Sequence, residues 1–127
     1  MIALDASVLI AHLSPLDAHH AAATAILLNA APGSMLVHCL TLAEVLVGGV
    51  RVGRGAAMRD DIRAASVQVA SQDGDEPLRL AELRATTGLK LPDCAILDVA
   101  IHHQASLATF DDALASAARR RGVIVLP

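Results

Sequence analysis

The sequence predicts an α/β protein with a mostly parallel sheet, and three observations lead to this prediction. Five short apolar runs alternate with helical patterns along the chain, which is typical of parallel strands covered by helices. Apolar residues make up 54% of the chain and charged residues 18%, enough for one self-standing core. The length of 127 residues fits a single domain spanning residues 1–127.

The predicted strands are short apolar runs bounded by turn residues or helical patterns, at residues 2–4, 35–37, 67–69, 107–108 and 123–126. The predicted helices have apolar periodicity and cover residues 8–13, 18–30, 42–47, 56–65, 77–87, 93–104 and 112–121. N-caps are expected at polar residues that precede these patterns, namely Ser7, Asp17, Thr41, Asp75 and Asp111. Gly88 and Gly122 stand where helices should end.

Composition excludes several classes of protein. Phe110 is the only aromatic residue, so modules that bind RNA by stacking bases on aromatic side chains are excluded. The net charge of −3 shows no excess of basic residues. If four of the 13 acids were neutralised by metal, however, 10 basic minus 9 acidic residues would leave +1. The position of the acids therefore matters more than their number.

The sequence also predicts a cytoplasmic protein with no membrane association. The N-terminus has no basic region before its apolar stretch, so a secretory signal is not expected. The longest charge-free apolar run, around residues 21–31, is shorter than the ~18 residues of a membrane span. Cys39 and Cys94 lie far apart in the sequence, as expected of reduced thiols.

Four acids lie near the predicted carboxyl ends of strands or at the helix starts that follow. Asp5 ends the first strand, Glu44 lies in the first turn of the helix after the second, and Asp111 follows the fourth. Asp93 opens a helix behind Pro92. Because ligands of an open α/β sheet bind beyond the carboxyl ends of the strands, these acids are expected to share one pocket.

Each of these acids also has a local structural explanation, and the residues alone leave both open. Thr41 and Glu44 have the spacing of a capping box. Asp93 and Asp111 suit helix N-termini, and Asp5 suits a turn. A cluster of carboxylates, by contrast, repels itself unless it binds a cation or retains protons. Oxygen ligands without histidine favour Mg²⁺ or Mn²⁺, which activate water for attack at phosphorus, so phosphodiester hydrolysis is the predicted chemistry.

Four short segments together resemble the PIN-domain family, especially the VapC toxins of bacterial VapBC toxin–antitoxin pairs. The segments are Ile2-Ala-Leu-Asp5-Ala-Ser7, Thr41-Leu-Ala-Glu44, Leu91-Pro92-Asp93 and Leu107-Ala-Thr109-Phe-Asp111. In this order and spacing they cover the whole chain. The resemblance implies a three-layer α/β/α fold and a Mg²⁺- or Mn²⁺-dependent endoribonuclease.

The resemblance also implies roles for residues and partners. Asp5, Glu44, Asp93 and Asp111 would be the catalytic and metal-binding acids, with the Thr109 hydroxyl assisting them. The protein would be a homodimer that cleaves tRNA or ribosomal RNA. A VapB-type antitoxin would neutralise it by laying its C-terminal segment in a groove near the early helices.

Two acids depart from the family pattern. Asp112 doubles the acid at the fourth position, but the T-x-D spacing selects Asp111, so Asp112 is expected in the exposed first turn of the helix. Asp98 lies five helical residues after Asp93, which turns it about 140° away from the face of Asp93. We expect Asp98 to pair with His102 at the i+4 position.

Other polar groups are assigned no site. The adjacent pairs His19-His20 and His102-His103 point in different directions on a helix and are not expected to bind metal. The cluster Arg119-Arg120-Arg121 suits a solvated helix C-terminus. The basic residues between Arg51 and Arg63 suit either a phosphate path or a solvated face.

Two alternatives remain open at this stage. A receiver-like module has a similar size, but it needs an acid pair after the first strand, an acceptor Asp after the third and a Lys after the fifth. This sequence has none of these features at those positions. A catalytically silent PIN-like interaction protein is the other alternative, and an RNA cleavage assay with and without chelator would distinguish it.

Overall fold

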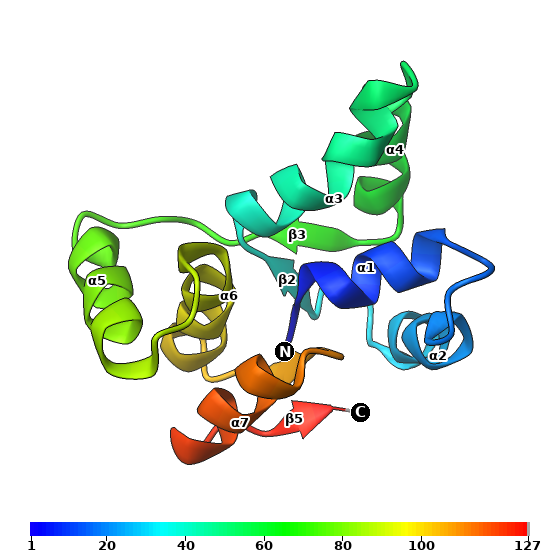
Figure 1. The fold of residues 1–127 in the computed structure, drawn as a ribbon. Coiled ribbons are helices and arrows are strands. Elements are labelled where there is room, and N and C mark those ends of the chain that lie inside the picture. The colour runs from blue at the N-terminus through cyan, green and yellow to red at the C-terminus, as the bar shows by residue number, and fades with distance from the viewer. Residues whose placement is uncertain (127) are drawn as a thin grey trace.

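The chain forms one five-stranded sheet in which all paired strands are parallel, with helices on both faces (Figure 1). The structure is a computed structural model and describes residues 1–126. Pro127, the last residue of the predicted domain, lies outside the described residues. The predicted α/β class with a parallel sheet of about five strands is confirmed.

The strands are β1 (Ile2–Leu4), β2 (Met35–Val37), β3 (Val67–Val69), β4 (Ser106–Ala108) and β5 (Val125–Leu126), in the spatial order β3-β2-β1-β4-β5. Three of them have the predicted bounds. The fourth begins one residue earlier, and the fifth begins at Val125 rather than Val123. The apolar runs located the strands well because both faces of this sheet are buried.

The helices are α1 (Ala6–Leu13), α2 (His20–Asn29), α3 (Cys39–Arg51), α4 (Gly55–Ala64), α5 (Glu76–Thr87), α6 (Leu91–His102) and α7 (Asp112–Arg120). On one face of the sheet, core side chains of α6 and α7 pack with Ala3, Leu36 and Leu107. On the other face, side chains of α1 to α4 pack with Leu4 and Ala108. Successive strand residues thus point to opposite layers, which gives the expected three-layer arrangement.

Several helices begin earlier or later than predicted because other residues cap them. Asp5, not Ser7, is the N-cap residue of α1, and α2 begins only at His20. Asp17 instead accepts a hydrogen bond from the backbone N–H of His19 at 2.8 Å, which forms a local turn. Gly88 follows the last residue of α5, where a helix end was predicted. It adopts a left-handed conformation with φ of 72°.

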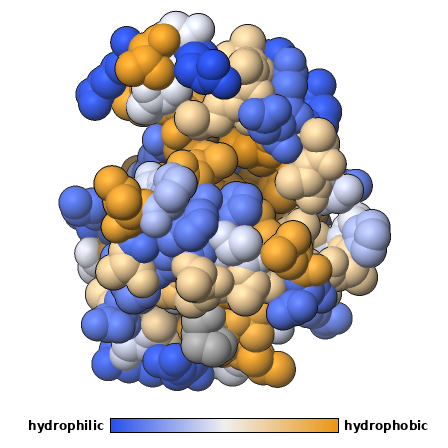
Figure 2. Space-filling view, turned by 90° about the vertical axis from the view of Figure 1, so that its right-hand side faces the viewer, coloured by the Kyte–Doolittle hydropathy of each residue, from blue (hydrophilic) through white to orange (hydrophobic). Residues whose placement is uncertain are grey.

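The pair α3 and α4 projects beyond the sheet at the top of Figure 1. In Figure 2, apolar surface lies in a recess below this projecting end. The exposed apolar side chains of the pair include Val47, Val50 and Val52. Among the described residues, no helix has the length and apolar character needed to cross a membrane.

Candidate functional site

The strand order places the carboxyl ends of β1 and β4 side by side. Leu4 at the end of β1 is in register with Ala108 at the end of β4. The strand β1 lies at the centre of the sheet. The next two strands in the chain, β2 and β3, lie on one side of it, and β4 and β5 lie on the other side. The crevice between β1 and β4 is therefore the topological switch point, where open parallel sheets bind ligands.

Asp5 lies at this point and is held in place by two hydroxyl groups. Its side chain is only 7% exposed. Asp5 Oδ2 accepts hydrogen bonds from Ser7 Oγ at 2.7 Å and Thr109 Oγ1 at 2.8 Å. Two donors on one carboxylate oxygen fix its orientation. The sequence pattern D-x-S thus positions the carboxylate, since the Ser7 hydroxyl serves Asp5 instead of capping a helix.

Thr109 connects Asp5 to Asp111. The Thr109 hydroxyl donates to Asp5 and accepts from the backbone N–H of Asp111 at 3.0 Å. Asp111 is the N-cap residue of α7, as predicted, and its Oδ1 accepts from Leu114 N at 2.9 Å. Only one oxygen of Asp111 has this role, so the cap and a place in an acidic site are compatible. Asp112 lies exposed in the first turn of α7, as expected.

Glu44 lies in the interior of α3, so the predicted capping box is wrong. The helix begins at Cys39, and the N-cap residue is His38, whose Nδ1 accepts from Leu40 N at 3.0 Å. Thr41 is a buried residue inside the helix and cannot cap it. A capping role therefore does not explain Glu44 at this position. Its carboxyl group is exposed, and the charge of Asp5 acts on it.

Asp93 is the third residue of α6, in the first turn, where Pro92 also suits the helix start. Burial raises the pKa of Asp93 to about 6, and the negative charges of Asp5, Asp111 and Glu44 act in the same direction. Burial and the charge of Asp5 likewise raise the pKa of Glu44.

The charges of Asp5, Glu44 and Asp111 thus all act on Asp93, but the four acids do not form a closed cage. Within residues 1–126, no three His, Cys, Asp or Glu side chains are placed to hold one metal ion as they stand. Glu44 is exposed, so its side chain can rotate, whereas Asp5 is fixed by its hydroxyl donors and Asp111 by its cap. A set of carboxylate oxygens without nitrogen or sulfur fits Mg²⁺ or Mn²⁺ by its chemistry.

Lys90 is a residue of this region that sequence reasoning missed. It is the N-cap residue of α6 and is exposed to solvent. Its positive charge lowers the pKa of both Glu44 and Asp93, against the effect of burial. Its position in the sequence could have indicated this role. Lys90 is the single lysine of the chain and lies three residues before Asp93.

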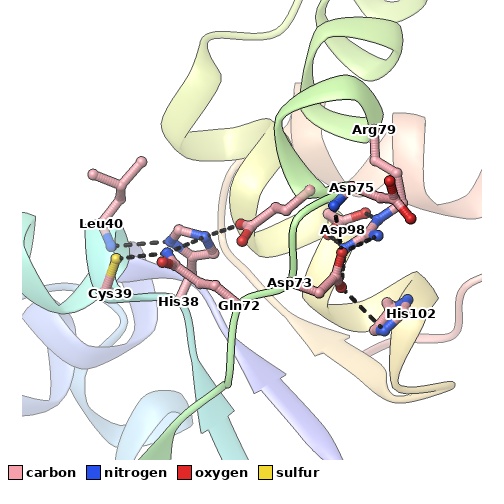
Figure 3. A network of polar contacts seen from close by, with 10 residues as sticks. His38, Cys39, Leu40, Gln72, Asp73, Asp75, Arg79, Asp98 and His102 are labelled. Carbon is pink, nitrogen blue, oxygen red and sulfur yellow. Dashed lines mark hydrogen bonds and ion pairs between the residues drawn. The ribbon is translucent and has the colours of Figure 1, made fainter.

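The start of α3 is tied to α5 by a buried pair. His38 Nδ1 accepts the backbone hydrogen bond of Leu40 (Figure 3), so we assign the ring proton to Nε2, which donates to Glu76 Oε1. Both side chains are buried. They form part of the lining of a pocket of about 510 Å³ between the starts of α3, α5 and α6. None of the four acids lines this pocket.

Asp98 does not pair with His102, contrary to the prediction. It is 5% exposed and accepts hydrogen bonds from Arg79 Nε at 2.9 Å and Nη2 at 3.1 Å (Figure 3). Arg79 also binds Asp73, whose Oδ2 lies 3.7 Å from His102 Nε2. The partner of Asp98 comes from α5 because a buried carboxylate gains more from a bidentate guanidinium than from a neighbouring imidazole. Asp98 therefore joins α6 to α5 and is not part of the acidic site.

The histidines form contacts of other kinds. The ring of His19 stacks on Phe110 with 4.3 Å between centroids, and His12 lies over His20 at 6.2 Å. His102 and His103 meet edge to face. The basic residues from Arg51 to Arg63 are exposed along the projecting α3–α4 pair.

Comparison with known proteins identifies the family. The PIN domain profile matches residues 2–120. The chain belongs to the PIN domain family. This is a family of nucleases, and the match spans every element that carries one of the four acids. No curated protein matches the chain significantly.

Three solved structures have the same fold as this chain. VapC20 of Mycobacterium tuberculosis, described as a sarcin–ricin loop cleaving toxin, is 18% identical with a TM-score of 0.77, over 92% of this chain and 95% of that one. FitAcB from Neisseria gonorrhoeae is 20% identical with a TM-score of 0.73, over 100% and 97%. PAE2754 from Pyrobaculum aerophilum is 21% identical with a TM-score of 0.65, over 98% and 87%. At these identities the likeness concerns the PIN fold.

Proposed function

We propose that this PIN domain protein is a Mg²⁺- or Mn²⁺-dependent endoribonuclease whose cation is held by Asp5, Glu44, Asp93 and Asp111. The observation that carries the proposal is the position of Asp93, whose carboxyl is acted on by the charges of the other three acids. Four acids from four separate segments would repel one another at neutral pH, and a divalent cation removes that repulsion.

Each residue has a definite task in this proposal. Asp5 is the fixed ligand, because Ser7 and Thr109 hold one of its oxygens. Glu44 and Asp93 complete the ligand set by side-chain rotation, and Asp111 contributes the oxygen that does not cap α7. Thr109 acts as a positioning residue that keeps Asp5 and the backbone of Asp111 in register. The bound ion supplies activation of water and charge stabilisation at the phosphate, which are the usual contributions of such ions.

The cellular role that we propose is that of a toxin in a toxin–antitoxin pair, acting on tRNA or ribosomal RNA in the cytoplasm. Support comes from the resemblance to VapC toxins and from the described target of VapC20. We further propose a homodimer and an antitoxin segment that covers apolar surface near the early helices. Exposed apolar side chains are present there, for example Ile10, Leu13 and Leu16.

The experiment that tests the proposal compares RNA cleavage by wild type and Asp5→Asn in Mn²⁺. Asp5→Asn should lose cleavage activity while keeping the fold, because an amide can still accept the Ser7 and Thr109 hydrogen bonds. Asp60→Asn on the exposed surface of α4 is a matched control and should cleave at the wild-type rate. Cleavage by Asp5→Asn at the wild-type rate would show that this acid set is not the active site.

A catalytically silent PIN protein remains the second candidate, and one observation favours it: the acids are not placed as a ready-made cage within the described part of the chain. In that case RNA would stay intact with Mn²⁺ as it does with chelator. The receiver-like alternative is excluded by topology, since receivers have the strand order 2-1-3-4-5 and this sheet has β3-β2-β1-β4-β5.

A further inference from the structure

Lys90 is fixed in position by the backbone on both sides of it. Gly88 ends α5 in a left-handed conformation, and Arg84 Nη1 donates to the carbonyls of Gly88 and Leu89, each at 2.8 Å. The Lys90 carbonyl then accepts the backbone N–H of Cys94 at 3.0 Å, as an N-cap residue should. The side chain of Lys90 therefore starts from a rigid point one turn before Asp93.

Lys90 caps the helix whose first turn carries Asp93, and its ammonium group is not bound to an acid of the described residues. Its charge acts on Glu44 and on Asp93, which come from different helices. Among the ion pairs of residues 1–126, none within 4.0 Å involves Lys90. An exposed, unpaired ammonium beside several carboxylates is available to a further anion.

Charge distribution makes this position unusual in the molecule. Lys90 is the only basic residue that acts on both Glu44 and Asp93. The arginines between Arg51 and Arg63 lie on the projecting α3–α4 pair, and Arg119, Arg120 and Arg121 lie at the far end of α7. A polyanion approaching the acids would meet one positive side chain at that point.

We propose that the Lys90 ammonium binds a phosphate of the RNA strand beside the acidic site. This inference rests on the proposed function and adds a substrate-binding residue to it. A lysine is suited to this task because its ammonium is a compact charge with three hydrogen-bond donors. Its flexible side chain allows it to bind a phosphate in more than one geometry. The contact would place the strand next to the carboxylates that otherwise repel it.

The test measures binding of a short single-stranded RNA by fluorescence anisotropy over a range of KCl concentrations, with Mg²⁺ present. All proteins are full length and carry Asp5→Asn so that the RNA is not cut. Adding Lys90→Gln should raise Kd about 5-fold and flatten the slope of log K against log salt by about 0.7, the value for one lost phosphate contact to a single strand. Lys90→Arg should keep most of the affinity, and Arg119→Gln is the control for loss of one positive charge.

A second measurement separates this role from simple balancing of the acidic charge. Without the Asp5 substitution, Lys90→Gln should keep at least the wild-type rise in Tm with Mn²⁺, because removing a nearby positive charge does not weaken cation binding. An RNA Kd and salt slope equal to those of the control would overturn the proposal for Lys90 and leave the nuclease function standing. If wild type binds RNA but does not cleave it, the nuclease function fails and the binding result still decides the role of Lys90. If RNA does not bind, both are wrong.

Discussion

Asp93 holds its proton at a higher pH than an ordinary aspartate, because burial and three neighbouring carboxylates oppose its ionisation. Its pKa rises from 3.8 to about 6 on folding, so the folded protein binds a proton that the unfolded chain releases. The contribution of Asp93 to the free energy of unfolding is therefore greatest below about pH 4 and is lost as pH rises through about 6. In chelator, we expect urea stability to fall between about pH 4 and about pH 6.

The variant Asp93→Asn provides the comparison for this pH effect. An amide cannot ionise, so its urea stability should depend less on pH over the same interval. Glu44, whose pKa is also raised, contributes in the same direction and leaves a smaller slope in the variant. Identical pH profiles for the two proteins would show that the pKa of Asp93 is not raised on folding.

The Thr109 hydroxyl is the second residue-scale feature with a measurable effect. It is 5% exposed, donates to Asp5 and accepts from the Asp111 backbone. Thr109→Val keeps the shape but leaves the Asp111 N–H without its acceptor and Asp5 with only the Ser7 donor, so we expect a loss of about 1–3 kcal/mol in the free energy of unfolding. Denaturant titration measures it, and Thr86→Val, on an exposed part of α5, should cost much less. A loss no larger than that of the control would show that the hydroxyl is not a structural link.

At the scale of the element, the start of α3 depends on a contact from a distant part of the chain. His38 caps α3 through Nδ1 and donates from Nε2 to Glu76 at the start of α5. His38→Ala removes the cap and leaves a buried carboxylate unpaired, so we expect a loss of about 3–5 kcal/mol. Glu76→Gln retains an acceptor for Nε2 and should cost about 1 kcal/mol.

Urea unfolding of both variants tests this arrangement. The large difference between them is expected only if the His38–Glu76 pair is buried as the structure has it. Equal and small losses would mean that α3 starts independently of α5.

The same elements show why helix starts were harder to predict than strands. Ser7 and Thr41 have the right chemistry for N-caps, but the Ser7 hydroxyl binds Asp5 and Thr41 is buried within α3. His38 is not a common cap, and its partner Glu76 lies 38 residues further along the chain. Strand positions depend on local apolar runs, whereas these caps depend on tertiary contacts, which a local pattern does not contain.

At the scale of the whole molecule, the acidic site should make stability depend on divalent ions. Mn²⁺ that binds only the folded state raises the free energy of unfolding by about 2.7 kcal/mol at a concentration 100 times Kd. We therefore expect thermal unfolding to show a clear rise in Tm for wild type and a much smaller one for Asp5→Asn. Equal shifts in both proteins would contradict a shared cation site that includes Asp5.

The four acids could be predicted from sequence because each follows a recognisable element in a fold whose strands end at one edge. Their ligand roles stay a prediction. Neither Lys90 nor the pairing of Asp98 with Arg79 could be predicted in this way. The charge of Lys90 acts on the acids without a direct contact. Arg79 binds Asp98 from another helix. Both depend on how α5 and α6 pack, for which the chain has no local motif.

The central position of β1 has a consequence for synthesis of the protein. Thr109 and Asp111, which flank Asp5 from the end of β4, are synthesised more than one hundred residues after it. A growing polypeptide thus has the first acid without its supports until Asp111 has been added. With the function proposed above, RNA in the translating cell would be at risk only after synthesis has passed Asp111.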